Sequence, residues 1–241
     1  MPLIEELNKQ GNILFNYRSF LPIPFMIITL LIYIYNIDLE QEEKSLIFET
    51  SCLLVGLLGQ IIRAITIGYA PHGTSGRNTN KQIADELNTK GMYSLVRNPL
   101  YLGNFFMWFS IVLFVNLIWL NLFYIICFWI YYERIIFAEE NFLRKKYADL
   151  YLKWANNTPI FIPRLNGWKT PDMNFSLKNI LKREYSGFFA LFLCFSLLNI
   201  AENYTRYNLL KLDNFWAYAL LISGGAALML KIFKKKQTFY I

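Results

Sequence analysis

Apolar residues are concentrated in six stretches that are separated by polar segments. These stretches cover residues 20–37, 46–70, 99–115, 117–137, 187–201 and 215–233. A helix rises about 1.5 Å per residue, so roughly 17–25 mostly apolar residues cross a hydrocarbon core of about 30 Å. The pattern therefore predicts an all-α, polytopic integral membrane helical bundle with about six transmembrane helices. Asn116 alone separates the third stretch from the fourth, which indicates a tight helical hairpin.

The positive charges follow this map of spans. Of the 24 lysines and arginines, all except Lys44, Arg63, Arg206 and Lys211 lie in segments that share one side of the membrane if both termini lie there. Cytoplasmic segments of membrane proteins collect Lys and Arg. We therefore place both termini in the cytoplasm, since a soluble helical protein would give no reason for this segregation.

The composition agrees with a membrane protein and excludes several other classes. Hydrophobic residues make up 55% of the 241 residues and charged residues 17%, with a net charge of +7, whereas soluble domains are about 25% charged. Topology accounts for the basic charge, and no zinc-finger or RNA-binding motif indicates a nucleic-acid partner. His72 is the single histidine, so a zinc site or a Ser-His-Asp triad lacks its usual residues. We expect no bound metal, no P-loop or GxGxxG cofactor site, and no required protein partner.

A first polar cluster, residues 71–104, leads into the third apolar stretch. Pro99 suits the first turn of a helix, where free N–H groups and the positive helix dipole can accept a carboxylate. Arg97 adds a positive charge beside that turn, and Gly103 lets a ligand or another backbone come close. Taken singly, Arg97 and Pro99 are explained more simply as a topological arginine and a helix start.

A second polar cluster follows the fourth stretch. Glu140 lies one helical turn before Arg144, an i,i+4 pair that stabilises a helix by about 0.2–0.5 kcal/mol. However, the adjacent carboxylates Glu139 and Glu140 are costly near the bilayer boundary unless they meet donors. The cluster therefore also fits a cationic or hydroxyl-rich ligand.

Together, the two clusters resemble the isoprenylcysteine carboxyl methyltransferase family and the related membrane phospholipid methyltransferases. The shared features are an Arg-x-Pro-x-Tyr-x-Gly pattern at residues 97–103, an uncharged helical hairpin, the Glu139-Glu140 pair and the Pro163-Arg164 exit. The resemblance covers residues 57–164 as a methyltransferase-like core of a single domain, 1–241, and the two additional spans in residues 185–241 have no counterpart. The family usually has His where this chain has Asn98, and an Asn can hydrogen-bond a cofactor but cannot act as a base.

The resemblance implies a cytoplasm-facing pocket for S-adenosylmethionine beside the hairpin. The residues that would bind this cofactor are Tyr93, Arg97, Asn98, Pro99, Tyr101, Gly103, Glu139 and Glu140. In-line methyl transfer from a sulfonium depends mainly on alignment and desolvation, and an anionic acceptor needs no general base. The cations that would position such an acceptor are Arg63, His72, Arg77 and Arg144.

The implied acceptor is a lipid or lipid-linked carboxylate, phosphate or amine that enters sideways between spans. The abundance of Ile, Asn and Lys favours a bacterial inner (plasma) membrane, where prenylated proteins are not expected as substrates. Two alternatives stay open. Membrane sterol reductases, which use NADPH, resemble this family in their cofactor-binding half, and a non-enzymatic membrane protein would use both clusters only as helix caps.

Overall fold

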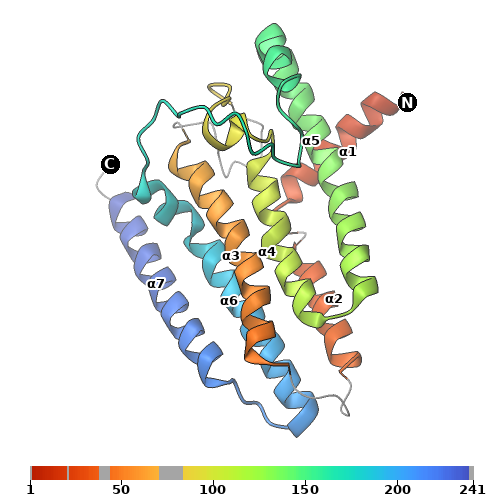
Figure 1. Cartoon of the computed structure of the whole chain (residues 1–241), viewed down its shortest axis with the longest axis vertical. Coiled ribbons are helices and arrows are strands. Elements are labelled where there is room, and N and C mark those ends of the chain that lie inside the picture. The colour runs from red at the N-terminus through yellow and green to blue at the C-terminus, as the bar shows by residue number, and fades with distance from the viewer. Residues whose placement is uncertain (1, 21, 38–43, 71–83, 239–241) are drawn as a thin grey trace.

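The polypeptide forms helices joined by turns and loops. The structure, a computed structural model, describes residues 2–20, 22–37, 44–70 and 84–238, and no strand occurs among them. The helices are α1 (Leu3–Tyr17), α2 (Pro22–Tyr35), α3 (Leu46–Gly68), the short 3-10 helix η1 (Gly91–Ser94), α4 (Pro99–Val115), α5 (Ile118–Ala155), α6 (Leu177–Tyr207) and α7 (Asn214–Thr238). In Figure 1 the long helices run side by side as an elongated bundle, and α1 crosses α5 near one end. The predicted all-α membrane fold is confirmed.

All six predicted spans are helical, but the helices differ in length. α3, α5, α6 and α7 are long and apolar enough to cross a membrane. The pair α1 and α2, bent by 76° at their junction, adds a fifth span if it is counted as one. α4 has 17 residues and is a shorter apolar helix. By length and composition the described residues thus support four or five spans, where the apolar pattern predicted about six.

Two helices extend well beyond their apolar stretches. α5 continues past Phe137 to Ala155, and α6 already begins at Leu177 and ends at Tyr207. Charged residues end an apolar stretch, but a helix continues when its charged side chains find partners. Glu184 and Glu202 lie in the two extensions of α6, and both are paired with arginines inside the bundle.

The hairpin of α4 and α5 forms as predicted. Asn116 ends α4 in the left-handed conformation, with φ 62° and ψ 36°, which Asn tolerates better than most residues. Aromatic rings fill the space between the two helices: the Phe105 ring lies 5.6 Å from that of Tyr124 and 5.1 Å from that of Phe128. Pairs of this kind resist rearrangement, so the hairpin gives a rigid wall to what lies beside it.

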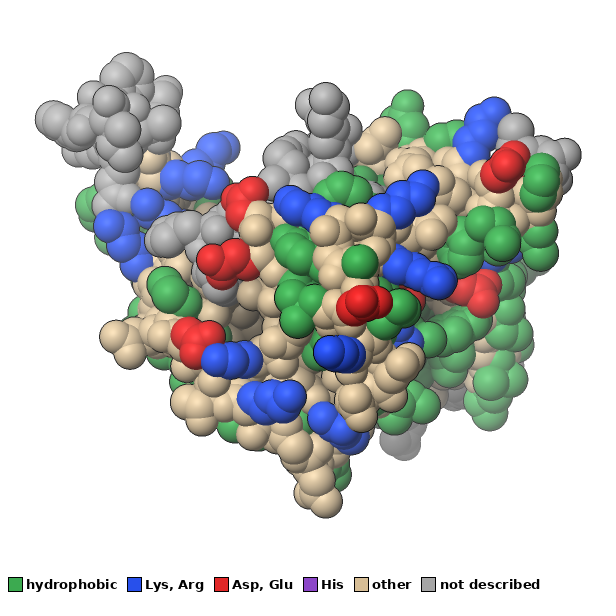
Figure 2. All heavy atoms as spheres, turned by 90° about the horizontal axis from the view of Figure 1, so that it is seen from above, with side chains coloured by type: hydrophobic (Ala, Val, Ile, Leu, Met, Phe, Trp, Pro, Cys, Tyr) green, Lys and Arg blue, Asp and Glu red, His purple; other side chains and the backbone are tan. Residues whose placement is uncertain are grey.

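The two ends of the bundle carry different charges. α1 starts and α7 ends at the same end (Figure 1), and Figure 2 shows Lys and Arg side chains spread over this end with fewer Asp and Glu. We call it the basic end. At the opposite end Glu202 binds Arg206, with 3.2 Å between Nε and Oε1, and lies 3.9 Å from the Lys44 ammonium.

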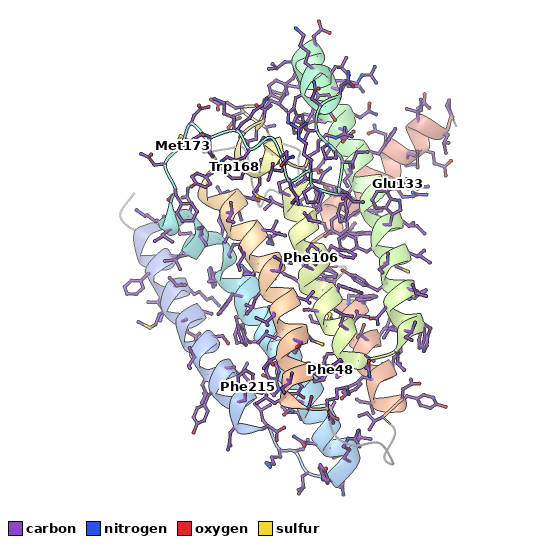
Figure 3. The ribbon with its side chains drawn as sticks, viewed as in Figure 1. Phe48, Phe106, Glu133, Trp168, Met173 and Phe215 are labelled. Carbon is purple, nitrogen blue, oxygen red and sulfur yellow. The ribbon has the colours of Figure 1, made fainter. Side chains whose placement is uncertain are left out.

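Residues 156–176, which we call the strap, run across the basic end. Trp168 and Met173 mark the strap in Figure 3. Backbone hydrogen bonds hold it in place: Arg97 N donates to Pro159 O at 2.8 Å and Gly91 N donates to Lys169 O at 2.8 Å. The strap therefore fixes η1 and the start of α4 in one position.

Candidate functional site

A polar cavity of about 620 Å³ opens at the basic end. Residues of η1 and of all six helices from α1 to α6 line it, together with Ala84, Glu86, Leu87 and Asn88. Small-molecule sites in proteins measure about 300–1,000 Å³. The cavity is therefore large enough for a nucleoside-sized ligand.

Three buried polar atoms in this cavity make no hydrogen bond of good geometry. They are Nε of Arg97, Oε1 of Glu140 and the hydroxyl of Tyr151. Arg97 Nη1 lies 2.8 Å from that same Glu140 oxygen, so the two form an ion pair at an angle unsuited to a hydrogen bond. Buried polar groups are nearly always satisfied, so these three atoms remain available to hydrogen-bond a group inside the cavity.

A second polar pair, Tyr101 on α4 and Glu139 on α5, lies beside the first. The Tyr101 hydroxyl donates a hydrogen bond of 2.8 Å to Oε2 of Glu139. The ring of Tyr101 lies 4.6 Å from that of Tyr132, whose hydroxyl accepts from Asn104 Nδ2 at 2.9 Å. These contacts hold the Glu139 carboxylate in place at the cavity wall.

The start of α4 is arranged as the sequence predicted. Pro99 occupies the first turn and is buried, and the side chain of Asn98 does not cap the helix. Instead, Asn98 Nδ2 donates to the Ile160 carbonyl of the strap at 3.1 Å. The N–H groups of the first turn thus have no side-chain cap, while Leu100 and Tyr101 line the cavity beside them.

Tyr93, on η1, closes another side of the cavity. Its carbonyl accepts a hydrogen bond of 3.0 Å from the indole of Trp154. Burial raises the pKa of the Tyr93 phenol, so the hydroxyl stays protonated and can donate a hydrogen bond at neutral pH.

Arg63 lies inside the bundle, and its charge is already paired. Its Nε and Nη2 each lie 2.7 Å from the carboxylate of Glu184 on α6. Nη1 donates to Oδ1 of Asn104 at 2.7 Å. The Arg63 side chain is 21% exposed and that of Glu184 only 5%. A bidentate pair with so little exposure to solvent has a fixed geometry.

Gly103 contacts α3 rather than the cavity. A Cβ there would lie 2.8 Å from the Gly59 carbonyl and would collide with the side chain of Arg63. The glycine therefore lets α3 and α4 approach closely, which is one of the two uses expected from the sequence. Its predicted contact with the cofactor stays a prediction.

A second, apolar cavity of about 520 Å³ adjoins the polar one. Side chains of α2 and α6 make most of its wall, among them Met26, Leu30, Leu191 and Leu198. Both cavities share a set of lining residues: Ser19, Pro22, Arg63, Asn104, Trp108 and Ser186. We call this shared region the junction.

The predicted site residues divide into three groups. Those lining the polar cavity are Arg63, Tyr93, Arg97, Asn98, Pro99, Tyr101, Glu139 and Glu140. Arg144 is exposed on the outer part of α5 and does not line either cavity. His72 and Arg77 lie outside the described residues. The roles assigned to all of these residues stay predictions.

The structure adds residues to this set that the sequence did not single out. Glu184 lies just before the apolar stretch of residues 187–201, and it lines the apolar cavity and pairs with Arg63 because α6 is longer than that stretch. Tyr151, on the same helix as Glu139 and Glu140, also lines the polar cavity. Asn104 directly follows the Arg-x-Pro-x-Tyr-x-Gly pattern. Its position, one helical turn beyond Tyr101, could have indicated from the sequence that it shares a face with Tyr101.

Helices of membrane-spanning length around a polar cavity at one end define a polytopic membrane protein with a small-molecule site. Comparison with known proteins narrows the class. The model of the phospholipid methyltransferase family matches residues 46–150, which include α3, α4 and most of α5. The resemblance predicted from the sequence is therefore confirmed for this part of the chain.

Curated relatives match the same portion. Protein-S-isoprenylcysteine O-methyltransferase of Saccharomyces cerevisiae is 34% identical over 116 residues, 46% of this chain and 47% of the relative. Its Schizosaccharomyces pombe counterpart is 31% identical over 120 residues, 48% of this chain and 50% of the relative. The nickel-cobalt-cadmium resistance protein NccN of Alcaligenes xylosoxydans xylosoxydans is 30% identical over 114 residues, 47% of this chain and 51% of the relative.

The chain thus spans about half the length of the curated relatives it matches. No solved structure matches it. Within the part of the chain that the structure describes, no group of three or more His, Cys, Asp and Glu residues is arranged to hold a metal ion.

Proposed function

We propose that this protein is an S-adenosylmethionine-dependent methyltransferase that acts on a lipid or lipid-linked acceptor at the cytoplasmic membrane face. One observation carries the proposal: a polar cavity with unsatisfied polar atoms meets an apolar cavity at the junction. Methyl transfer to a lipid needs such an arrangement, because the polar donor and the apolar acceptor must arrive from different sides.

The residues of the polar cavity fit the cofactor. S-adenosylmethionine carries a carboxylate, an ammonium group, ribose hydroxyls and an adenine ring. Arg97 and the first turn of α4 suit the carboxylate, whereas Glu139 and Glu140 suit the ammonium group or the ribose hydroxyls. Nε of Arg97 is placed to complete those contacts, and the Tyr151 hydroxyl lies close to both Arg97 and Glu140.

The bound cofactor would supply an electrophilic methyl group on a sulfonium. The work of this chain's own residues is to align and to exclude water. Tyr101 fixes Glu139, and the aromatic rings of the hairpin hold Tyr101 and Tyr132 in turn. The strap holds Arg97 through its backbone N–H. A shift of either wall would misalign the reacting groups.

The apolar cavity fits a hydrocarbon chain. It lies between helices α2 and α6 at the level of the spans, and its wall is mostly aliphatic. A lipid chain lying there would bring its headgroup to the junction. This accounts for an enzyme embedded in a membrane, since a soluble acceptor would need no such cavity.

Cofactor binding tests the proposal directly. We expect detergent-purified protein to bind S-adenosylmethionine at micromolar concentration and NADPH not at all. Arg97→Ala and Glu140→Ala should weaken binding by at least about tenfold, because each removes a charged contact of about 1.5–3 kcal/mol.

Glu133→Ala serves as the matched control. Glu133 is a carboxylate on the same helix, but its side chain is 54% exposed and points away from the bundle (Figure 3). Equal binding by all variants, or binding of NADPH instead, would refute the methyltransferase assignment. Transfer of labelled methyl to extracted lipids then identifies the acceptor.

We also propose that the basic end faces the cytoplasm, as its lysines and arginines favour. A reporter fused after Ile241 should then be active on the cytoplasmic side. Activity on the opposite side would overturn this orientation. Assignment to a bacterial inner membrane stays a prediction from composition.

A further inference from the structure

The last part of α5 turns back on the helix that precedes it. Ala148 has φ 43° and ψ −118°, values far from those of an α-helix. We call residues 149–155, which follow this break, the return segment. In a continuous helix Tyr151 would lie about 16 Å beyond Glu140 along the axis, yet the two side chains are close neighbours. The break at Ala148 therefore brings Tyr151 back to Glu140.

The return segment forms one wall of the polar cavity. Tyr151 is 3% exposed, Trp154 is half-buried, and both line the cavity. The Trp154 indole donates to the Tyr93 carbonyl at 3.0 Å, and the centres of the Tyr151 and Trp154 rings are 5.8 Å apart. The Tyr151 hydroxyl makes no hydrogen bond of good geometry, although it lies close to Arg97 and Glu140. The position of the segment, rather than a bond of its own, thus holds this hydroxyl in the wall.

The backbone at Ala148 is strained. Glycine adopts a positive φ readily, whereas a Cβ makes such a φ unfavourable for alanine. The φ and ψ of Ala148 lie outside even the left-handed helical region, which Asn116 and Asn208 occupy. Strained residues of this kind persist only where the surrounding structure enforces them, and they are concentrated at functional sites. Relaxation of the backbone at Ala148 would move the return segment away from the cavity.

Contacts on either side of the return segment limit how far it can move. Before the break, the hydroxyl of Tyr147 donates to the Ala84 carbonyl at 2.7 Å. After the segment, a backbone hydrogen bond anchors Pro159 of the strap. Residues 156–158 join the segment to this anchor, and they span about 10 Å when extended. The segment can therefore swing at Ala148 while both of its neighbours stay in place.

We propose that Ala148 is a positioning residue for the ligand of the polar cavity. Its strained backbone holds Tyr151 in the cavity wall and is the hinge on which the return segment opens. The inference rests on the proposed function only for the identity of that ligand, S-adenosylmethionine. The ligand enters and leaves while the segment is open, and Tyr151 contacts it once the segment has closed. The strain at Ala148 sets how often the segment opens.

Accessibility of position 151 measures this opening without any ligand. Tyr151→Cys, in a protein whose Cys52, Cys127 and Cys194 are replaced by alanine, gives one thiol that a water-soluble maleimide reaches when the segment is open. Ala148→Gly removes the strain of the closed form, and glycine also disfavours a continuous helix. We expect labelling to slow by about five- to thirtyfold, the factor that corresponds to the cost of a left-handed alanine.

Ala226→Gly is the matched control for this substitution. Ala226 is an exposed residue of α7 without a positive φ, so the change removes the same methyl group but relieves no strain. Labelling should keep its wild-type rate there. Ala148→Val is the opposite change and should speed labelling, because a β-branched side chain tolerates a positive φ even less than alanine does. Labelling of Ala148→Gly at or above the wild-type rate would overturn the proposal.

Release of the ligand separates positioning from a merely structural effect. Bound, labelled S-adenosylmethionine should leave Ala148→Gly about five- to thirtyfold more slowly than it leaves the wild type. Its equilibrium affinity should change less, because entry uses the same opening and slows as well. A glycine that only stabilised the fold would raise Tm and leave the release rate unchanged, and this outcome would overturn the proposal.

The outcomes distinguish this proposal from the one it rests on. Failure to bind S-adenosylmethionine would refute the methyltransferase assignment, and the labelling comparison, which uses no ligand, would still decide whether Ala148 is the hinge. An unchanged release rate in a protein that does bind the cofactor would refute only the role of Ala148.

Discussion

The crossing of α3 and α4 gives a sharp test of the structure, because the two helices meet glycine against glycine. A Cβ added at Gly59 would lie 2.8 Å from the backbone nitrogen of Met107 and closer still to the Gly103 carbonyl. Both obstacles are backbone atoms, so the helices themselves would have to separate. We therefore expect Gly59→Ala to destabilise the protein and to pull Arg63 on α3 away from Asn104 on α4.

The magnitude follows from two opposing effects. Replacing Gly by Ala within a helix favours the helix by about 1 kcal/mol. Overpacking costs about 1–3 kcal/mol, and rigid obstacles favour the upper part of that range. The net loss is about 1–2 kcal/mol, or about 2–8 °C in Tm for a chain of this size.

Gly225→Ala is the matched control, since nothing lies within 4 Å of the Cβ that it would add. This variant should keep only the helix-propensity gain of up to about 1 kcal/mol. Thermal unfolding in one detergent, followed by circular dichroism, compares both variants with the wild type. A Gly59→Ala protein that melts at or above the wild-type temperature would show that the close crossing is not present.

Three further outcomes test other parts of the molecule. Trp216→Phe removes the indole that donates a hydrogen bond to Oε2 of buried Glu49 at 2.7 Å. It should lower the free energy of unfolding, measured in denaturant titrations, by about 1–3 kcal/mol. An unchanged unfolding midpoint would contradict that contact. Asn98→Ala removes the hydrogen bond to the Ile160 carbonyl and should reduce stability by about 0.5–1.5 kcal/mol. It should weaken cofactor binding less than Arg97→Ala does. A larger loss of cofactor affinity in Asn98→Ala than in Arg97→Ala would place Asn98 at the cofactor. Burial lowers the pKa of Lys44 below its ordinary value of 10.5, so between that lowered pKa and pH 10.5 the unfolded chain binds more protons and stability rises with pH. The Tm of the wild type minus that of Lys44→Met should therefore increase between neutral pH and pH 10, and a decrease in this difference would contradict a lowered pKa.

The apolar stretches predicted the fold well, because a helix that spans a membrane needs a long run of apolar residues. The α4 and α5 hairpin, with its turn at Asn116, follows from the sequence alone. α1 does not, because polar residues interrupt its apolar ones and its place depends on the fit of Gly11 against the backbone of α5. The number of spans is equally hard to derive, since α4 is short and the bend between α1 and α2 is a tertiary feature.

The candidate site was predictable where its residues lie close to one another in the sequence. Arg97, Tyr101 and the Glu139-Glu140 pair could be found from the family pattern that the sequence resembles, and the structure brings them to one cavity. Glu184 could not be found in this way, because it is 121 positions away from Arg63. Only the packing of α6 against α3 joins them, and a charge at the edge of an apolar stretch gives no sign of its partner.

The Arg63–Glu184 pair has a consequence for how this protein can be divided or recombined. The recognisable segment, residues 46–150, ends before α6 begins, so the shortest piece that retains the site is longer than the shortest piece that can be identified. A chimera that joined this segment to another protein's helices would bury a guanidinium without its counter-charge, which costs about 3–5 kcal/mol. Exchange of parts among such proteins is therefore restricted by a single ionic contact, and α6 would have to be transferred together with α3.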